Sequence, residues 1–186
     1  MLSRRILIGL LAFSPAACLS PNPSLYTLAV VPGADQAGAP RVIELRAVAV
    51  AHYLERSQIV RSSENLRLDV IGNDWWGEPL DAMLGRVLSE ELTQRLPGST
   101  VYSENGAIST NAGATVAINV QRLDADASGA VVLIAQVAVS SARANVTRTV
   151  RYSVAPTAPG TPGLVNAMSA AVGQLADTVA AMVAAR

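Results

Sequence analysis

The chain carries few side chains that could perform chemistry, and their types limit what that chemistry could be. His52 is the only histidine, Cys18 is the only cysteine, and all 14 basic residues are arginine. Without lysine the chain cannot form a P-loop nucleotide site or a Schiff base. One histidine and one cysteine cannot supply the roughly four ligands of a structural zinc site, and a lone cysteine cannot form an internal disulfide. We therefore predict no metal and no cofactor, and we expect any ATP-driven step to occur on a partner.

The candidates for acid–base catalysis each have a simpler interpretation. His52 follows a predicted strand, and no G-x-S-x-G nucleophile motif occurs in the sequence, which favours a histidine at the rim of the sheet. Glu90 and Glu91 are neighbours on a predicted helix, where adjacent side chains diverge by about 100° and do not face each other. Glu78 and Asp81 lie near the start of that helix, where its dipole favours negative charge. We predict no catalytic residue and a protein that is not an enzyme.

Composition narrows the class of protein further. The 14 acidic residues balance the 14 arginines, whereas nucleic-acid binders normally carry a basic excess to displace counterions from phosphates. Hydrophobic residues make up 51% of the chain and charged residues 15%, which is typical of a folded protein. We predict a folded domain that does not bind nucleic acid.

The first 18 residues are typical of a targeting segment that ends at a cysteine. Two arginines precede an apolar run at residues 6–13, which is too short to cross the ~30 Å core of a membrane and therefore predicts a signal peptide. Two alanines stand directly before Cys18, and this site resembles a bacterial lipobox, although Pro15 replaces the usual leucine. Acyl chains on Cys18 would hold the protein on a membrane, and Leu19 in place of an aspartate indicates the outer membrane. The alternative is ordinary secretory cleavage after Ala16, which leaves Cys18 as a free thiol.

Hydrophobic periodicity predicts six strands and two helices. Alternation of apolar and polar residues predicts three early strands, at residues 26–30, 42–51 and 66–70, the last of which stops at residues 72–74. An apolar stripe at helical spacing predicts a helix at residues 79–96, with Arg95 on its polar side. Three further strands are expected at residues 115–124, 130–140 and 145–155. A linker at residues 156–162 then leads into a C-terminal helix with a face of small residues.

The element order β-β-β-α-β-β-β-α predicts an α+β fold with two layers. Two helices would cover a mostly antiparallel or mixed sheet. We expect a signal peptide at residues 1–17, a lipidated tether at residues 18–24 and a single periplasmic α/β domain at residues 25–186. The small-residue face of the last helix permits close approach of another element, which makes a homo-oligomer a further expectation.

Two stretches have a composition suited to contact with a partner. Residues 53–61 mix apolar and charged side chains after a buried strand, and the alternative is a surface loop leading into a short strand. Residues 74–79 hold both tryptophans, which we place in a loop before the first helix. Adjacent side chains on an extended segment point to opposite sides, so one ring would fix the start of the helix and the other could contact a partner. The candidate partner-binding residues are Tyr53, Leu54, Arg56, Gln58, Ile59, Val60, Trp75, Trp76, Glu78 and Pro79.

Three segments together resemble a known family. The sequence reads YLERSQIV at residues 53–60, WWGEPL at residues 75–80 and RVLSEEL at residues 86–92. These segments are similar, in the same order, to YLDRPQIV, RWAEPL and RVLAENL in the PqiC (YmbA-type) auxiliary lipoproteins of ABC-type transport systems. The chain differs from that pattern at Ser57, where proline is usual, and at Trp75, where arginine is common.

The resemblance implies a function that the composition does not show. It implies a lipoprotein that is anchored in the outer membrane, faces the periplasm and works beside an MCE-domain protein and an ABC permease, which move lipids between the inner and outer membranes. In this interpretation the domain is a docking adaptor. The alternative is a periplasmic lipid-binding carrier lipoprotein with an apolar pocket between its sheet and its helices.

Overall fold

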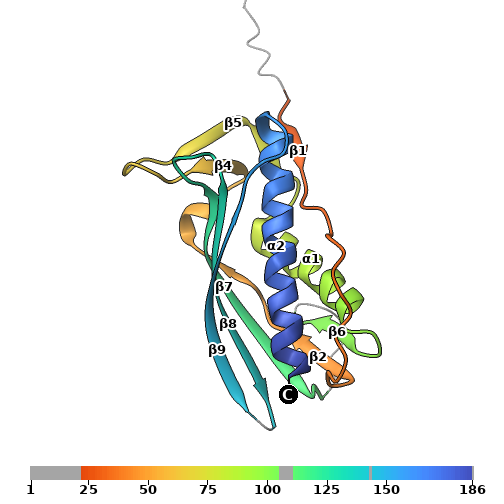
Figure 1. Ribbon diagram of the computed structural model, residues 1–186. Helices are drawn as coiled ribbons and strands as arrows, with labels where there is room; N and C mark the ends of the chain where they lie inside the picture. The colour runs from red at the N-terminus through yellow and green to blue at the C-terminus, as the bar shows by residue number, and fades with distance from the viewer. Residues whose placement is uncertain (1–21, 105–110, 143, 186) are drawn as a thin grey trace, which may run out of the picture.

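The computed structural model describes residues 22–104, 111–142 and 144–185, so Cys18 and the predicted signal peptide lie outside the described residues. Within these ranges, two α-helices cover one face of a mixed sheet of nine strands (Figure 1). This arrangement confirms the predicted α+β fold. The strands are β1 (Ser24–Tyr26), β2 (Val42–Leu45), β3 (Ala49–Val50), β4 (Gln58–Ser62), β5 (Asp69–Trp76), β6 (Thr100–Ser103), β7 (Ala114–Ala125), β8 (Val131–Ser141) and β9 (Asn145–Val154). The helices are α1 (Leu80–Arg95), α2 (Gly160–Ala184) and the short 3₁₀ helix η1 (His52–Leu54).

Strand β7 is the centre of the sheet. One edge of β7 pairs with β8 in antiparallel fashion, and β8 pairs in the same way with β9. Along its other edge β7 pairs in parallel with β2, β3 and β4 in succession. The chain from residue 42 to residue 62 therefore runs beside β7 in three pieces, and the excursion at residues 51–57 leaves the sheet between the last two.

We expected one continuous strand at residues 42–51. This prediction is wrong, because the strand is broken between β2 and β3. The amide of Arg46 still donates to the carbonyl of Val116, at 2.9 Å, but the amide of Ala47 donates to the carboxylate of Glu104, at 3.2 Å. Pairing with β7 resumes only at Ala49. The side chain of Glu104, distant in sequence, thus takes the place of a β7 carbonyl as the acceptor for the Ala47 amide. The strand is interrupted at this point.

The strand expected at residues 66–70 is displaced toward the C-terminus. Asn65 and Leu66 have φ angles of 55° and 61° and form the turn that precedes β5. β5 then runs through residues 72–74, where we expected it to stop, because β1 pairs with residues 74–76 in parallel. Both tryptophans consequently lie in a strand, not in a loop. β6, which pairs with β2, was not predicted.

The two helices and the three long strands agree closely with their predicted positions. α1 begins directly after Pro79, and its apolar stripe is buried. Arg95 is also buried, which corrects its predicted place on the polar side of α1. α2 begins at Gly160, within the expected linker, since proline is tolerated in a first helical turn and Pro162 lies there. α2 is long and apolar enough to span a membrane by length and composition, but 67% of that stretch is buried inside the domain.

An extended segment at residues 27–41, the strap, lies against both helices. In Figure 1 it descends from β1 beside α2 and crosses α1 before reaching β2. Its backbone bonds to helix side chains: the Ala29 amide donates to Ser169 Oγ at 3.0 Å, and the Val31 amide donates to Glu91 Oε1 at 2.8 Å. A Cβ added to Gly173 would lie 2.9 Å from Cβ of Val31. The small-residue face of α2 therefore receives the strap of its own chain.

Candidate functional site

The two stretches that we expected to contact a partner meet on one side of the domain. The Trp76 amide donates to the Ser57 carbonyl at 2.7 Å, and Gln58 pairs with Trp75 across β4 and β5. Residues 55–57, at the end of the excursion, and the segment from Trp76 to Asp81 line a surface groove of about 480 Å³. Tertiary pairing thus builds one site from two separate segments.

The floor of this groove is apolar, and it includes part of the predicted contact set. Leu80 and Trp76 are buried there, and Val50 lies beside them. Trp76 directly precedes the turn into α1, so its burial fits the expectation that one ring fixes the start of that helix. Leu54, Ile59 and Val60 are buried in the core as well. Leu54, Ile59 and Val60 do not line the groove; they support it from the core and are not available as a contact surface, whereas Trp76 and Leu80 form part of its lining.

The rim of the groove is charged. Glu55, Arg56, Glu78 and Asp81 line it, so three carboxylates stand against one guanidinium. Glu78 Oε1 accepts from Arg86 at 2.7 Å, whereas Glu55 and Asp81 are exposed. An acidic rim over an apolar floor suits an apolar segment flanked by basic residues. Trp75, on the opposite face of β5 from Trp76, donates from Nε1 to the Gly72 carbonyl at 3.1 Å and remains partly exposed.

His52 lies beside the groove and makes a simple ion pair. Its Nδ1 is 2.9 Å from Glu55 Oε2, and this hydrogen bond raises the pKa of the exposed imidazole. In the part of the chain that the structure describes, no cluster of three or more His, Cys, Asp or Glu side chains could hold a metal ion. The contact with Glu55 orients the two side chains at the rim.

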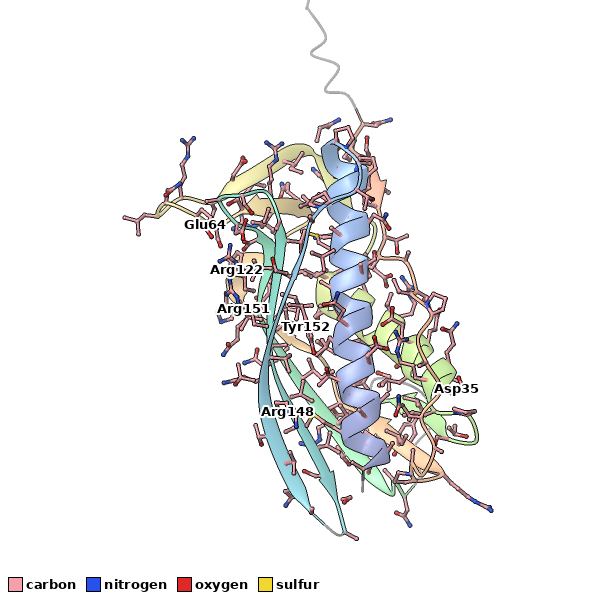
Figure 2. The ribbon with its side chains drawn as sticks, in the orientation of Figure 1. Asp35, Glu64, Arg122, Arg148, Arg151 and Tyr152 are labelled. Carbon is pink, nitrogen blue, oxygen red and sulfur yellow. The ribbon has the colours of Figure 1, made fainter. Side chains whose placement is uncertain are left out.

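A partly buried polar cluster around the buried Asp124 holds the excursion against the sheet. Tyr53 donates to Asp124 Oδ2 at 2.7 Å, and Arg122 donates to Asp124 Oδ1 at 2.9 Å. Arg122 also donates to Glu64 at 2.6 Å, and these two residues are labelled in Figure 2. Burial and the adjacent carboxylate raise the pKa of Tyr53 far above its usual value, so its hydroxyl stays protonated as a donor. Tyr53 therefore positions the loop at residues 55–57. Sequence reasoning missed this cluster, although Arg122 and Asp124 stand two residues apart on a predicted strand.

Comparison with known proteins shows which family the chain belongs to. Residues 26–180 match the family described as ABC-type transport auxiliary lipoprotein component. The chain belongs to this family. The match confirms the resemblance drawn from the three segments at residues 53–60, 75–80 and 86–92, all of which lie inside the matched range.

Two curated relatives are similar to part of the chain. Over 106 residues it is 29% identical to the intermembrane transport lipoprotein PqiC of Escherichia coli (strain K12), and it matches PqiC of Shigella flexneri equally well. That stretch covers 54% of this chain and 57% of each relative, so the chain spans little more than half the length of the curated relatives.

Two solved structures share the fold of this auxiliary lipoprotein. A crystal structure of an uncharacterized protein superposes with a TM-score of 0.74 at 20% identity and covers 87% of this chain and 99% of its own. A protein from Xanthomonas campestris superposes with a TM-score of 0.67 at 15% identity, covering 84% of this chain and 92% of its own. At these identities the similarity concerns the fold alone.

Proposed function

We propose that this protein is an outer-membrane lipoprotein that faces the periplasm and docks the end of an MCE-domain protein of an ABC-type lipid transport system. The observation that carries the docking role is the groove between residues 55–57 and residues 76–81. Its apolar floor offers burial to a partner segment, and its acidic rim selects for basic flanks. The family and the PqiC relatives support the link to intermembrane transport.

Charge reversal at the rim tests the docking role. Replacing Glu55 and Asp81 together with lysine is expected to reduce co-purification of the MCE-domain protein from native membranes about tenfold, because like charges oppose the basic flanks of the partner. Asp35→Lys is the matched control, since this exposed carboxylate lies on the strap, away from the groove (Figure 2). Equal recovery of the partner by all variants, or no recovery by the native protein, would count against the proposal.

The anchor is tested separately at Cys18. We expect Cys18→Ala to move the protein from the outer-membrane fraction to the soluble periplasm, because acyl chains on the thiol supply the stable attachment. Fractionation followed by an alkaline carbonate wash measures this change. A native protein that is already soluble would indicate secretory cleavage after Ala16, and a Cys18→Ala variant that stays on membranes would contradict the anchor.

The carrier function receives no support from the packing at the centre of the layer between the sheet and the helices. An apolar lipid pocket would have to lie between the sheet and the helices. In the described residues that layer is filled by side chains with no exposed area, among them Leu84, Leu88, Val172 and Leu175. The docking adaptor therefore remains the function that the geometry favours.

A further inference from the structure

The exposed large apolar side chains of the described residues flank β5, two of them before its first residue and one on β1 beside its last residues. They are Leu66, which is fully exposed, and Leu25 and Leu68, which are 66% and 42% exposed. Leu66 and Leu68 lie in the hairpin tip, residues 63–68, which joins β4 to β5 and projects away from the body of the domain in Figure 1. Within the described residues the Leu66 side chain has no packing role and that of Leu68 is partly exposed, so the projecting tip offers a surface for contact with an apolar phase.

The hairpin tip is braced on the sheet. Glu64 pairs with Arg122 of β7 at 2.6 Å, and the Arg67 amide donates to the Glu64 carbonyl at 3.2 Å. Between these two contacts the turn places Asn65 and Leu66 in the left-handed region, which leucine rarely adopts. The chain thus holds an apolar side chain outward at the cost of backbone strain, although a polar residue or glycine would fit the turn more easily.

The tether leaves the domain at the same end. The described chain starts at Asn22, whose carbonyl accepts from Asn73 Nδ2 of β5 at 3.3 Å, and Ser24 pairs with Asp74. Only residues 19–21 separate Asn22 from the proposed acylation site at Cys18, and the four residue steps from Cys18 to Asn22 span at most ~14 Å. The turn between β8 and β9 lies at the far end (Figure 1). Such a short tether would hold this end of the domain close to the lipid surface.

The side chains around the tip suit the headgroup region of a membrane. Arg67 is exposed and makes no ion pair with the residues that the structure describes, whereas Arg61 pairs with Asp69 at 3.4 Å. A guanidinium binds lipid phosphate in bidentate fashion. Leu25 lies opposite Trp75 on the neighbouring strands β1 and β5, and tryptophan is favoured at the boundary between lipid and water.

We propose that the hairpin tip is a second membrane contact, in which Leu66 and Leu68 enter the surface of the phospholipid bilayer and Arg67 contacts lipid phosphates. This inference rests on the proposed lipid anchor at Cys18. Together the anchor and the tip attach the domain at two points and restrict its rotation about the tether, which holds the docking groove in a fixed orientation to the membrane.

The test places an environment-sensitive fluorophore on a single introduced thiol of the full, acylated protein. Leu66→Cys reports on the tip, and Ala142→Cys, in the exposed turn between β8 and β9, is the matched control. An acylated Cys18 has no free thiol and does not react. The proteins are reconstituted on vesicles of phosphatidylethanolamine and phosphatidylglycerol, and flotation is measured first. We expect a blue shift, a several-fold rise in emission and quenching by nitroxide-labelled lipids at position 66, and none of these at position 142.

The possible outcomes separate this inference from the proposed anchor. Protein that does not float with the vesicles overturns the anchor and the membrane contact together. Protein that floats while the probe at position 66 remains water-like and unquenched overturns the membrane contact alone. A blue shift that depends on protein concentration and is insensitive to lipid quenchers would instead show that a second copy of the chain covers the tip, and this also overturns the inference.

Discussion

Replacing Arg95 with methionine is expected to lower the free energy of unfolding by about 3 to 5 kcal/mol. Arg95 is 1% exposed and joins α1, α2 and the strap. Its guanidinium donates to Asp177 at 2.6 Å, to the Val31 carbonyl at 3.0 Å and to the Gly173 carbonyl at 3.2 Å. Methionine retains most of the apolar volume but leaves these buried carbonyls without a donor, and an unsatisfied buried polar group is costly. The decrease in the free energy of unfolding therefore comes from lost hydrogen bonds.

The strap should loosen in this variant before the rest of the domain. The Gln36 amide donates to the Arg95 carbonyl at 2.6 Å, and a Cβ on Gly33 would lie 2.3 Å from Arg95 Nε, so the strap passes directly over the guanidinium. Urea unfolding followed by circular dichroism measures the global loss, and hydrogen exchange at the Val31 amide measures the local one. Arg86→Met is the control on the same helix, because its exposed pairs with Glu78 and Glu90 contribute about 1 kcal/mol or less. Equal losses in the two variants would contradict the role of Arg95.

Replacing Glu91 with glutamine is expected to stabilise the protein by about 2 to 3 kcal/mol at pH 8 and to change it little at pH 4.5. Burial raises the pKa of Glu91 to about 7 from a usual value of 4.5. One carboxylate oxygen accepts from the Val31 amide, at 2.8 Å, and the other is buried without a partner among the described residues. Glutamine keeps an acceptor for Val31 and carries no charge, so it avoids the cost of ionising a buried group.

The sign of the pH dependence follows from the raised pKa. Between about pH 4.5 and pH 7 the folded protein binds more protons at Glu91 than the unfolded chain does, so stability falls as pH rises through this window and then levels off. The Glu91→Gln variant should lack this slope. Urea unfolding at a series of pH values measures it, and Glu90→Gln, at the exposed neighbouring position, should keep the native slope. A slope unchanged in Glu91→Gln would assign the effect to other groups.

The sequence by itself determined the elements that depend on local signals. The helix at Leu80–Arg95 has a complete apolar stripe between Pro79 and Pro97, and β7, β8 and β9 form consecutive hairpins with turn residues between them. Each element carries its periodicity and its boundaries within one segment, because helix bonds span four residues and hairpin partners lie close in the chain. The segments that carry the family resemblance could be read in the same way, because each lies within one short stretch of sequence.

The tertiary structure alone decided the features that depend on partners distant in sequence. The breaks along residues 42–62, the parallel pairing of β1 with β5 and of β6 with β2, and the course of the strap are each set by segments tens of residues away. The charge of the Arg95 side chain predicts that it is exposed. Its burial is possible because Val31, Gly173 and Asp177 supply hydrogen-bond acceptors around it. The groove likewise forms only because the Trp76 amide bonds to the Ser57 carbonyl and brings the two segments together. Backbone groups in irregular segments must find hydrogen-bond partners wherever the fold supplies them, and no local pattern records which distant residue that will be.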